Sequence, residues 1–171
     1  MLALATVTGA GALWTLRLGG FFALRPGAGL AQAIYLGALA VPVAVAIDLV
    51  RPFPRDLNAA WPEAWLFYPS IAVVAVALLQ LAPLALLYGL LRRAWPAMVL
   101  ASAVESGVQL AAGSAPLPAA TFTLVLALAL AELVLLRRHG IGAAILFRVT
   151  YYLGWHVLWG GARLALGIGG P

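Results

Sequence analysis

The chain contains no cysteine, no lysine and only two histidines, His139 and His156. Because cysteine is missing, disulfides, thiol catalysis and cysteine-ligated metal are excluded. The His-Glu-x-x-His pattern of many zinc sites is also missing. We therefore expect no metal and no other cofactor. Since the sequence has no basic stripe interleaved with aromatic residues, we also expect no nucleic-acid partner.

Charge is scarce, because only 9% of the 171 residues are charged while 65% are hydrophobic, and the mean hydropathy is +1.06. A soluble domain carries about 25% charged residues. The apolar runs are continuous and lack the alternation typical of a membrane β-barrel. These properties predict an all-α, multi-pass bundle of membrane helices that forms a single domain over residues 1–171. We expect contact with membrane lipid and a location in a bacterial-type cytoplasmic membrane.

Six apolar segments are long enough, or nearly so, for the roughly 20 residues of a spanning helix. They cover residues 3–24, 28–50, 65–91, 96–112, 118–136 and 141–166. Charged and turn-forming residues separate them, at 25–27, 51–55, 92–93, 113–116 and 137–140. The first segment lacks a basic leader and contains Arg17, so we interpret it as a retained membrane helix. The polar stretch 51–64 is expected to form an interfacial loop.

Arginine is unevenly divided between the two sets of loops. The first, third and fifth loops carry five arginines, namely Arg25, Arg92, Arg93, Arg137 and Arg138. The opposite side carries Arg51, Arg55 and Arg163, diluted by Asp56 and Glu63. Arginine-rich loops stay in the cytoplasm. We therefore predict that these three loops are cytoplasmic and that both termini face outward.

The last apolar segment carries Arg148, Tyr152 and His156 at the i, i+4, i+8 spacing of one helix face. An arginine at mid-membrane costs about 2.5–3.5 kcal/mol on insertion scales, so Arg148 is expected to have a partner or a function. For His156, a structural histidine and a catalytic one are both consistent with the sequence. Trp155 and its aromatic neighbours are more typical of packing than of a ligand cage.

Glu105 lies near the centre of the fourth segment, between Ser102 and Gln109. A carboxylate there must be protonated, paired or in a hydrated cavity. Three interpretations follow: an ion pair with Arg148 or Arg17, a catalytic or substrate-binding role, or a protonated hydrogen-bond donor.

Two further carboxylates lie close to arginines in the sequence. Glu132 precedes Arg137 and Arg138 by about one turn, so we expect a solvated carboxylate at the helix end, with a site residue as the alternative. Asp48 is expected to form an interfacial pair with Arg51, three residues along the chain.

Several segments resemble the CAAX protease and bacteriocin-processing (CPBP) family of membrane-embedded proteases. Residues 136–148 resemble that family's last motif, in which an Arg-Arg-x-Gly turn leads into an Ala-Ala-Ile-Leu helix. The continuation over 151–160 resembles a divergent bacterial branch, 61–84 resemble its early helix, and 105–109 its middle helix. The resemblance implies a helical membrane fold and an endopeptidase that acts on a peptide or a membrane protein.

The chain departs from the family pattern at the residues that matter most for catalysis. No Glu-Glu pair is present, and Val76 and Gln80 stand where the early helix would supply glutamate and histidine. Arg148 stands at the position of the last motif's histidine, and Tyr152 at that of its asparagine. An active protease and a catalytically inactive relative are therefore both consistent with the resemblance.

If the chain is a protease, the resemblance leaves few residues to do the chemistry. Glu105 would be the general base, His156 would orient water or stabilise an oxyanion, and Arg148 would keep Glu105 ionised. The candidate substrate-binding residues are Gln109, Tyr152, Trp155 and Glu132. This hypothesis predicts a water-filled cavity shared by Glu105, Arg148 and His156.

Two non-enzymatic functions are alternatives. The small size fits a subunit or scaffold of a larger membrane complex, in which the polar stripe would be dry, paired and structural. A small-solute transporter or binding subunit is compatible with six helices and a buried Arg/Glu pair. The sequence shows no inverted repeat and no pair of broken helices, which are typical of transporters.

Overall fold

A computed structural model describes residues 2–22, 29–113 and 117–168 of the chain. The predicted breaker Arg25-Pro26-Gly27 and residues 114–116 of another lie outside the described residues. The elements are α1 (Leu2–Leu18), α2 (Leu30–Val50), the 3-10 turn η1 (Arg55–Leu57), α3 (Ala64–Ala75), η2 (Val76–Leu81), α4 (Ala82–Leu91), α5 (Ala94–Ala111), α6 (Pro118–His139), α7 (Ile141–Tyr152), η3 (Leu153–Trp159) and α8 (Gly160–Ala165).

The helical segments predicted from hydropathy are present near their expected bounds. Two π-helical segments join shorter helices into longer ones, so that α3, η2 and α4 form one helix and α7, η3 and α8 form another. Within the described residues, four helices are long and apolar enough to cross a membrane: Leu30–Val50, Ala64–Leu91, Pro118–His139 and Ile141–Ala165. By length and composition, these are the helices of a membrane protein.

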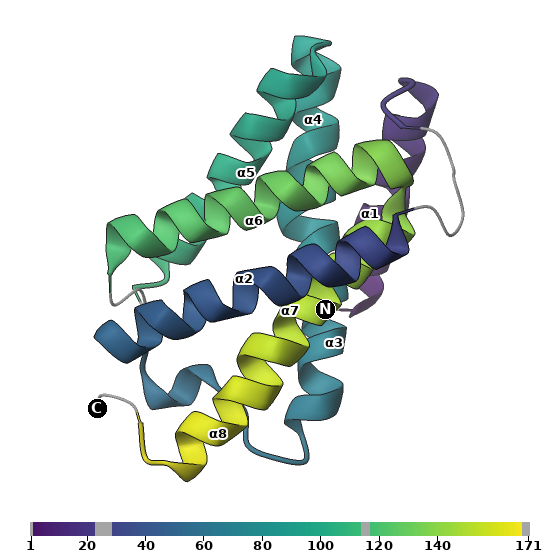
Figure 1. Cartoon of the computed structure of the whole chain (residues 1–171). Helices are drawn as coiled ribbons and strands as arrows, with labels where there is room; N and C mark the ends of the chain where they lie inside the picture. The colour runs from purple at the N-terminus through teal and green to yellow at the C-terminus, as the bar shows by residue number, and fades with distance from the viewer. Residues whose placement is uncertain (1, 23–28, 114–116, 169–171) are drawn as a thin grey trace.

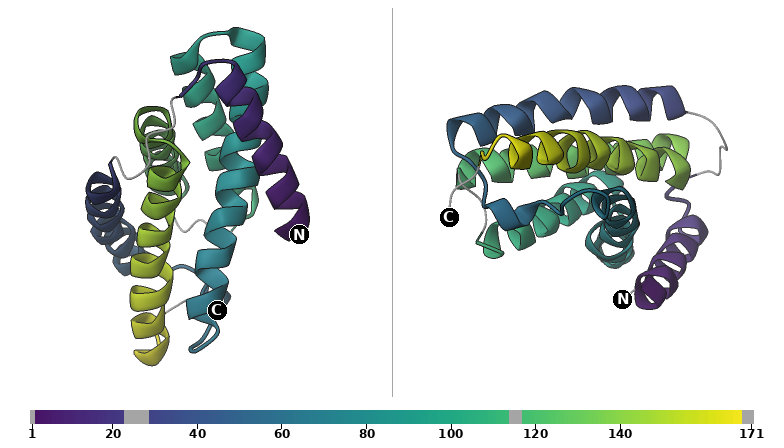
Figure 2. Two further views of the ribbon diagram at one scale, coloured as in Figure 1. Left: turned by 90° about the vertical axis from the view of Figure 1, so that its right-hand side faces the viewer. Right: turned by 90° about the horizontal axis from the view of Figure 1, so that it is seen from below.

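The helices form a bundle in which α2, α6 and α7 pack beside one another, while the α3–α4 helix crosses behind them (Figure 1). Helix α5 packs between α4 and α6, and α1 lies on the outside against η2 and α4 (Figure 2). The largest buried apolar cluster joins α1, α4, α5 and α6, and its members include Leu16, Leu84, Met98 and Leu133. This packing brings the middle of α5, α6 and α7 together.

Glycine allows α2 to approach the α7–η3 helix closely. A methyl group on Gly37 would lie 2.7 Å from the carbonyl oxygen of Phe147, and one on Gly154 would lie 2.5 Å from Val41 Cγ2. Neither position has room for a side chain. Small residues at such contacts let helix backbones come together in a membrane protein.

The two ends of the bundle differ in charge. One end has the exposed arginines Arg17, Arg92, Arg93, Arg137 and Arg138. The other end has exposed Arg51 and Arg55, together with exposed Asp56 and Glu63. Arg163, which the sequence places among the charges of this second end, is fully buried. Counting it as a loop charge was wrong, and the asymmetry between the ends is larger than the sequence suggests.

Candidate functional site

Arg148 lies at the centre of a buried cluster of charges contributed by α5, α6 and α7. Its Nη1 is 2.5 Å from Glu105 Oε1 and its Nη2 is 2.9 Å from Glu105 Oε2, which is a bidentate pair. Its Nε is 2.6 Å from Glu132 Oε2. Glu105 and Glu132 are each only 1% exposed and Arg148 is 5% exposed. The guanidinium therefore joins three helices through two carboxylates inside the bundle.

The cluster bears on the interpretations of both glutamates. Glu105 pairs with Arg148, as one of its three interpretations proposed. The prediction that Glu132 is a solvated helix-end carboxylate was wrong. Glu132 lies on the buried face of α6, whereas Arg137 and Arg138 lie on the exposed face. Closeness in sequence did not predict the environment of Glu132, because successive residues of a helix point in different directions.

Gln80 is a member of this cluster that the sequence did not single out as a site residue. Its side-chain amide donates a hydrogen bond to Glu105 Oε2, and Gln80 is fully buried in the π segment η2. Among the described residues its Oε1 has no hydrogen-bond partner, and the same is true of Glu132 Oε1 and Ser102 Oγ. The sequence feature that could have identified Gln80 is a single glutamine within a long, mainly apolar helix. Buried polar atoms of this kind normally have a partner, such as a water molecule.

The stripe of Arg148, Tyr152 and His156 is present, and the π segment η3 straightens it. Four residues of α-helix turn through about 400°, so each step along such a stripe drifts by roughly 40°. The wider turns of η3 contain more residues per turn and offset this drift. The Arg148 guanidinium carbon lies 5.8 Å from the Tyr152 ring centre, which is 4.9 Å from that of His156.

His156 is held by aromatic and amide contacts. Its ring stacks on Tyr68 with centroids 4.3 Å apart, and Asn58 Nδ2 lies 3.4 Å from its Nδ1. Arg163 Nη1 donates to Asn58 Oδ1 at 2.7 Å, so the NH₂ of that amide must face His156. Because an NH₂ group can only donate, Nδ1 is the acceptor and the proton of the neutral ring is on Nε2.

A cavity of about 100 Å³ connects the cluster to the aromatic stripe. Its polar and aromatic lining includes Glu105, Gln109, Thr121, Arg148, Tyr151, Tyr152, Trp155 and His156. The structure therefore brings six of the seven candidate site residues to one chamber. The seventh, Glu132, supports Arg148 from outside this lining. The volume suits about three water molecules at their liquid density.

A second buried arginine lies further along the same helix. Arg163 Nη2 donates to the Phe53 carbonyl at 2.5 Å, and its Nε is 3.1 Å from Asp48 Oδ2. That N–H is not aimed well enough to count as a hydrogen bond, so we regard the contact as a charge pair. Trp159 Nε1 donates to the same Asp48 oxygen at 2.7 Å. The predicted pair of Asp48 with Arg51 was wrong, because Asp48 points into the bundle.

The charges set what the site can do. An ionised carboxylate has about four lone-pair positions, and Glu105 uses three of them for Arg148 and Gln80. One position is left for a water molecule in the cavity. Among residues 2–22, 29–113 and 117–168, no group of three His, Cys, Asp or Glu side chains could hold a metal ion.

The chain matches no protein-family model, no curated protein and no solved structure.

Proposed function

We propose that this protein is a CPBP-like intramembrane endopeptidase, with six membrane-spanning helices in a bacterial-type cytoplasmic membrane. One observation supports the proposal above all others: Glu105, Arg148 and His156 border a single cavity, although they come from α5, α7 and η3. These are residue types that activate water and stabilise developing charge. The resemblance of residues 136–148 to the family's last motif also supports the proposal.

The arrangement offers a substitute for the missing Glu-Glu motif. Two carboxylates are present in one cluster, but α5 supplies Glu105 and α6 supplies Glu132. Gln80 binds Glu105 from the early helix, at the position where the family would supply histidine. The proposal therefore assigns the role of a paired carboxylate motif to residues that are distant in sequence.

In the proposed reaction, Glu105 takes a proton from water while the water oxygen bonds to the carbonyl carbon of the substrate amide. Negative charge develops on the carbonyl oxygen, and the N–H of His156 Nε2 donates a hydrogen bond to it. The carbon–nitrogen bond then breaks as the proton passes from Glu105 to the amide nitrogen. A carboxylic acid and an amine leave, and Glu105 is again ionised.

Arg148 has a positioning role in this scheme, because it holds both oxygens of Glu105. Tyr152 and Trp155 border the chamber between the charged cluster and His156. The chamber accepts water but is too small for a stretch of peptide chain. A substrate would enter by separating helices that border it, such as α2 and α6.

A second candidate function is a non-enzymatic subunit of a membrane complex, and one observation favours it. Both oxygens of Glu105 already bind the same guanidinium. A closed, buried pair of this kind can fix helix packing without any chemistry. The experiment that tests the protease must therefore also distinguish this function.

The test is to reconstitute the purified protein in lipid vesicles with solubilised bacterial membrane proteins and to count new peptide N-termini by mass spectrometry. We expect new termini with the wild-type protein and at least a tenfold loss with His156→Phe, since removing one hydrogen-bond donor to a developing oxyanion costs about 10²–10³-fold. This variant keeps a ring to stack on Tyr68 but removes both ring nitrogens. Glu63→Gln, which changes an exposed carboxylate, is the matched control and should cleave like the wild type.

Glu105→Gln should also abolish the new termini, provided that circular dichroism shows an unchanged helix content. The background is set by vesicles that contain the bacterial membrane proteins but lack this protein. If the wild type produces no termini beyond that background, the protease proposal is wrong and the non-enzymatic function is favoured. If His156→Phe and Glu105→Gln both cleave as well as the wild type, the activity does not come from this cavity.

A further inference from the structure

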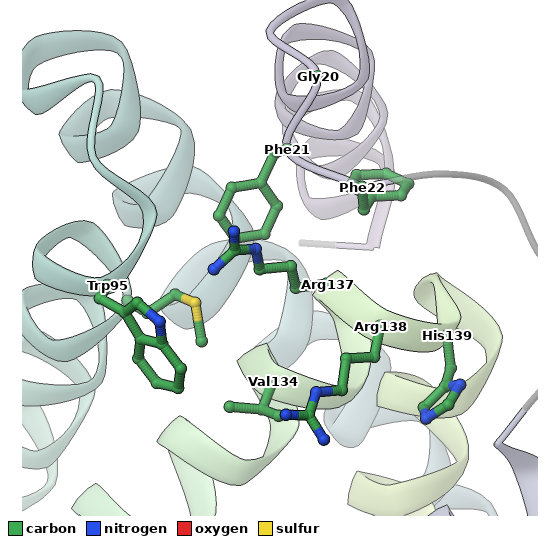
Figure 3. Close-up of a pocket in the computed structure, with 9 residues that line it drawn as sticks. Gly20, Phe21, Phe22, Trp95, Val134, Arg137, Arg138 and His139 are labelled. Carbon is green, nitrogen blue, oxygen red and sulfur yellow. The ribbon is translucent and has the colours of Figure 1, made fainter.

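A second pocket lies at the arginine-rich end of the bundle, apart from the Arg148 cluster. It has a volume of about 790 Å³ and is bordered by residues just after α1, at the start of α5 and at the end of α6. Figure 3 shows Phe21, Trp95 and Val134 around it, with Arg137 and Arg138 on one side. The pocket is independent of the proposed protease chemistry.

The two arginines present their charge to this space. Both side chains extend from the end of α6 into this space, Arg137 toward Phe21 and Arg138 toward Val134 (Figure 3). The guanidinium carbon of Arg137 lies 5.9 Å from the ring centre of Phe21, which is a cation–π contact. Among the ion pairs of the described residues, none includes Arg137 or Arg138. Their positive charge is therefore available to a ligand.

The surroundings leave that charge without compensation. The exposed residues Arg17, Arg92 and Arg93 lie at the same end of the bundle. Three of the five acidic residues are buried in the pairs with Arg148 and Arg163. The other two, Asp56 and Glu63, lie at the opposite end. An anion in this pocket would meet several positive charges and no described carboxylate.

We propose that this pocket binds the phosphodiester headgroup of an anionic phospholipid. Guanidinium groups match phosphate oxygens in charge and in the geometry of their N–H donors. The apolar part of the lining, formed by Phe21, Trp95 and Val134, suits the glycerol and the first acyl carbons. The pocket lies at the ends of apolar helices, where basic residues and tryptophan meet lipid headgroups. A free phosphate ion would use the arginines but not the apolar lining.

The test is a titration of the protein in uncharged detergent, with bound lipid counted by native mass spectrometry. The probe is dioctanoyl phosphatidylglycerol, compared with dioctanoyl phosphatidylcholine and with inorganic phosphate. We expect the anionic lipid to bind most tightly. The double substitution Arg137→Gln/Arg138→Gln should weaken it about 25-fold, because each basic residue near an anionic lipid contributes roughly a fivefold factor.

The double substitution Arg51→Gln/Arg55→Gln is the matched control, because it removes two exposed arginines at the other end. It should change the apparent Kd by less than about twofold if the site is local. Arg138→Gln alone keeps the contact of Arg137 with Phe21 and should still weaken binding about fivefold.

Three outcomes would overturn the proposal. Equal binding by the Arg137→Gln/Arg138→Gln variant and the wild type would show that the pocket is not the site. An equal loss with the control would show that binding follows net charge alone. Displacement of the lipid by an equal concentration of inorganic phosphate would identify a free anion, and not a lipid headgroup, as the ligand.

Discussion

Arg148 and Arg163 lie on the same long helix, Ile141–Ala165, and each binds a carboxylate from another helix. Arg148 directs its hydrogen bonds to the carboxylates Glu105 and Glu132 and also borders a cavity. Arg163 is 0% exposed and binds one carboxylate, Asp48, while its other donors meet oxygens of the 53–58 loop.

Arg148 therefore holds carboxylates together, whereas Arg163 mainly holds the backbone of a loop in place. Arg163 ties the loop after α2 to the end of the bundle, and through Asn58 it orients His156. Around Arg148, the buried atoms Gln80 Oε1 and Glu132 Oε1 have no hydrogen-bond partner in the part of the chain that the structure describes. Arg148 and Glu105 border a cavity and are therefore suited to bind water or substrate, whereas Arg163 and Asp48 are both 0% exposed and border no part of this cavity.

The largest loss of stability is expected from Arg163→Met. This substitution leaves Asp48 buried without its counter-charge and frees two loop carbonyls, and breaking a buried ion pair costs about 3–5 kcal/mol. The measurement is the free energy of unfolding in detergent, from SDS titration followed by far-UV circular dichroism. Arg55→Met, at an exposed position, should cost less than about 0.5 kcal/mol. A loss under about 1 kcal/mol for Arg163→Met would contradict its architectural role.

Trp159→Phe should have the next largest effect. The ring is kept, but the N–H that donates to Asp48 is lost, and a hydrogen bond to a charged group contributes about 1.5–3 kcal/mol. The same SDS titration measures it. We expect the loss to disappear in the background of Asp48→Asn together with Arg163→Met, because the charged acceptor is then missing. An unchanged loss in that background would mean that Trp159 acts through packing alone.

A double-mutant cycle on Glu105→Gln and Arg148→Gln should give a coupling energy of about 1–2 kcal/mol, since contacting residues in one network couple by 0.5–3 kcal/mol. We expect Arg148→Gln alone to destabilise less than Arg163→Met, because the adjacent cavity can hydrate Glu105. Thermal unfolding of all four proteins gives the ranking. If Arg148→Gln proved the more damaging of the two, the cluster would be structural and the non-enzymatic function would gain support.

The smallest effect is expected for Arg51→Gln. Asp48 binds Arg163 and Trp159, so the exposed Arg51 should contribute less than about 0.5 kcal/mol to stability. The measurement is the unfolding midpoint in SDS. A loss comparable to that of Trp159→Phe would restore the pairing that the sequence suggested.

Hydropathy predicted the helices well because it depends only on local composition. The segment expected over 118–136 is α6, and the one over 65–91 is the α3–η2–α4 helix. The partner of Glu105 was among the predicted alternatives, because few cations lie inside the apolar segments. The partner of Asp48 was missed, since Arg51 is near in sequence while Arg163 is near only in the folded chain.

The sequence by itself determined that this chain forms apolar helices and that a few charges must be buried within them. Only the tertiary structure decided which charges meet. Rotation and tilt of each helix, and the π segments η2 and η3, set the directions of Gln80, Glu132 and His156. These orientations arise from packing between distant segments, such as α2 against α7 at Gly37. Partner choice among buried charges is therefore a property of the assembled bundle.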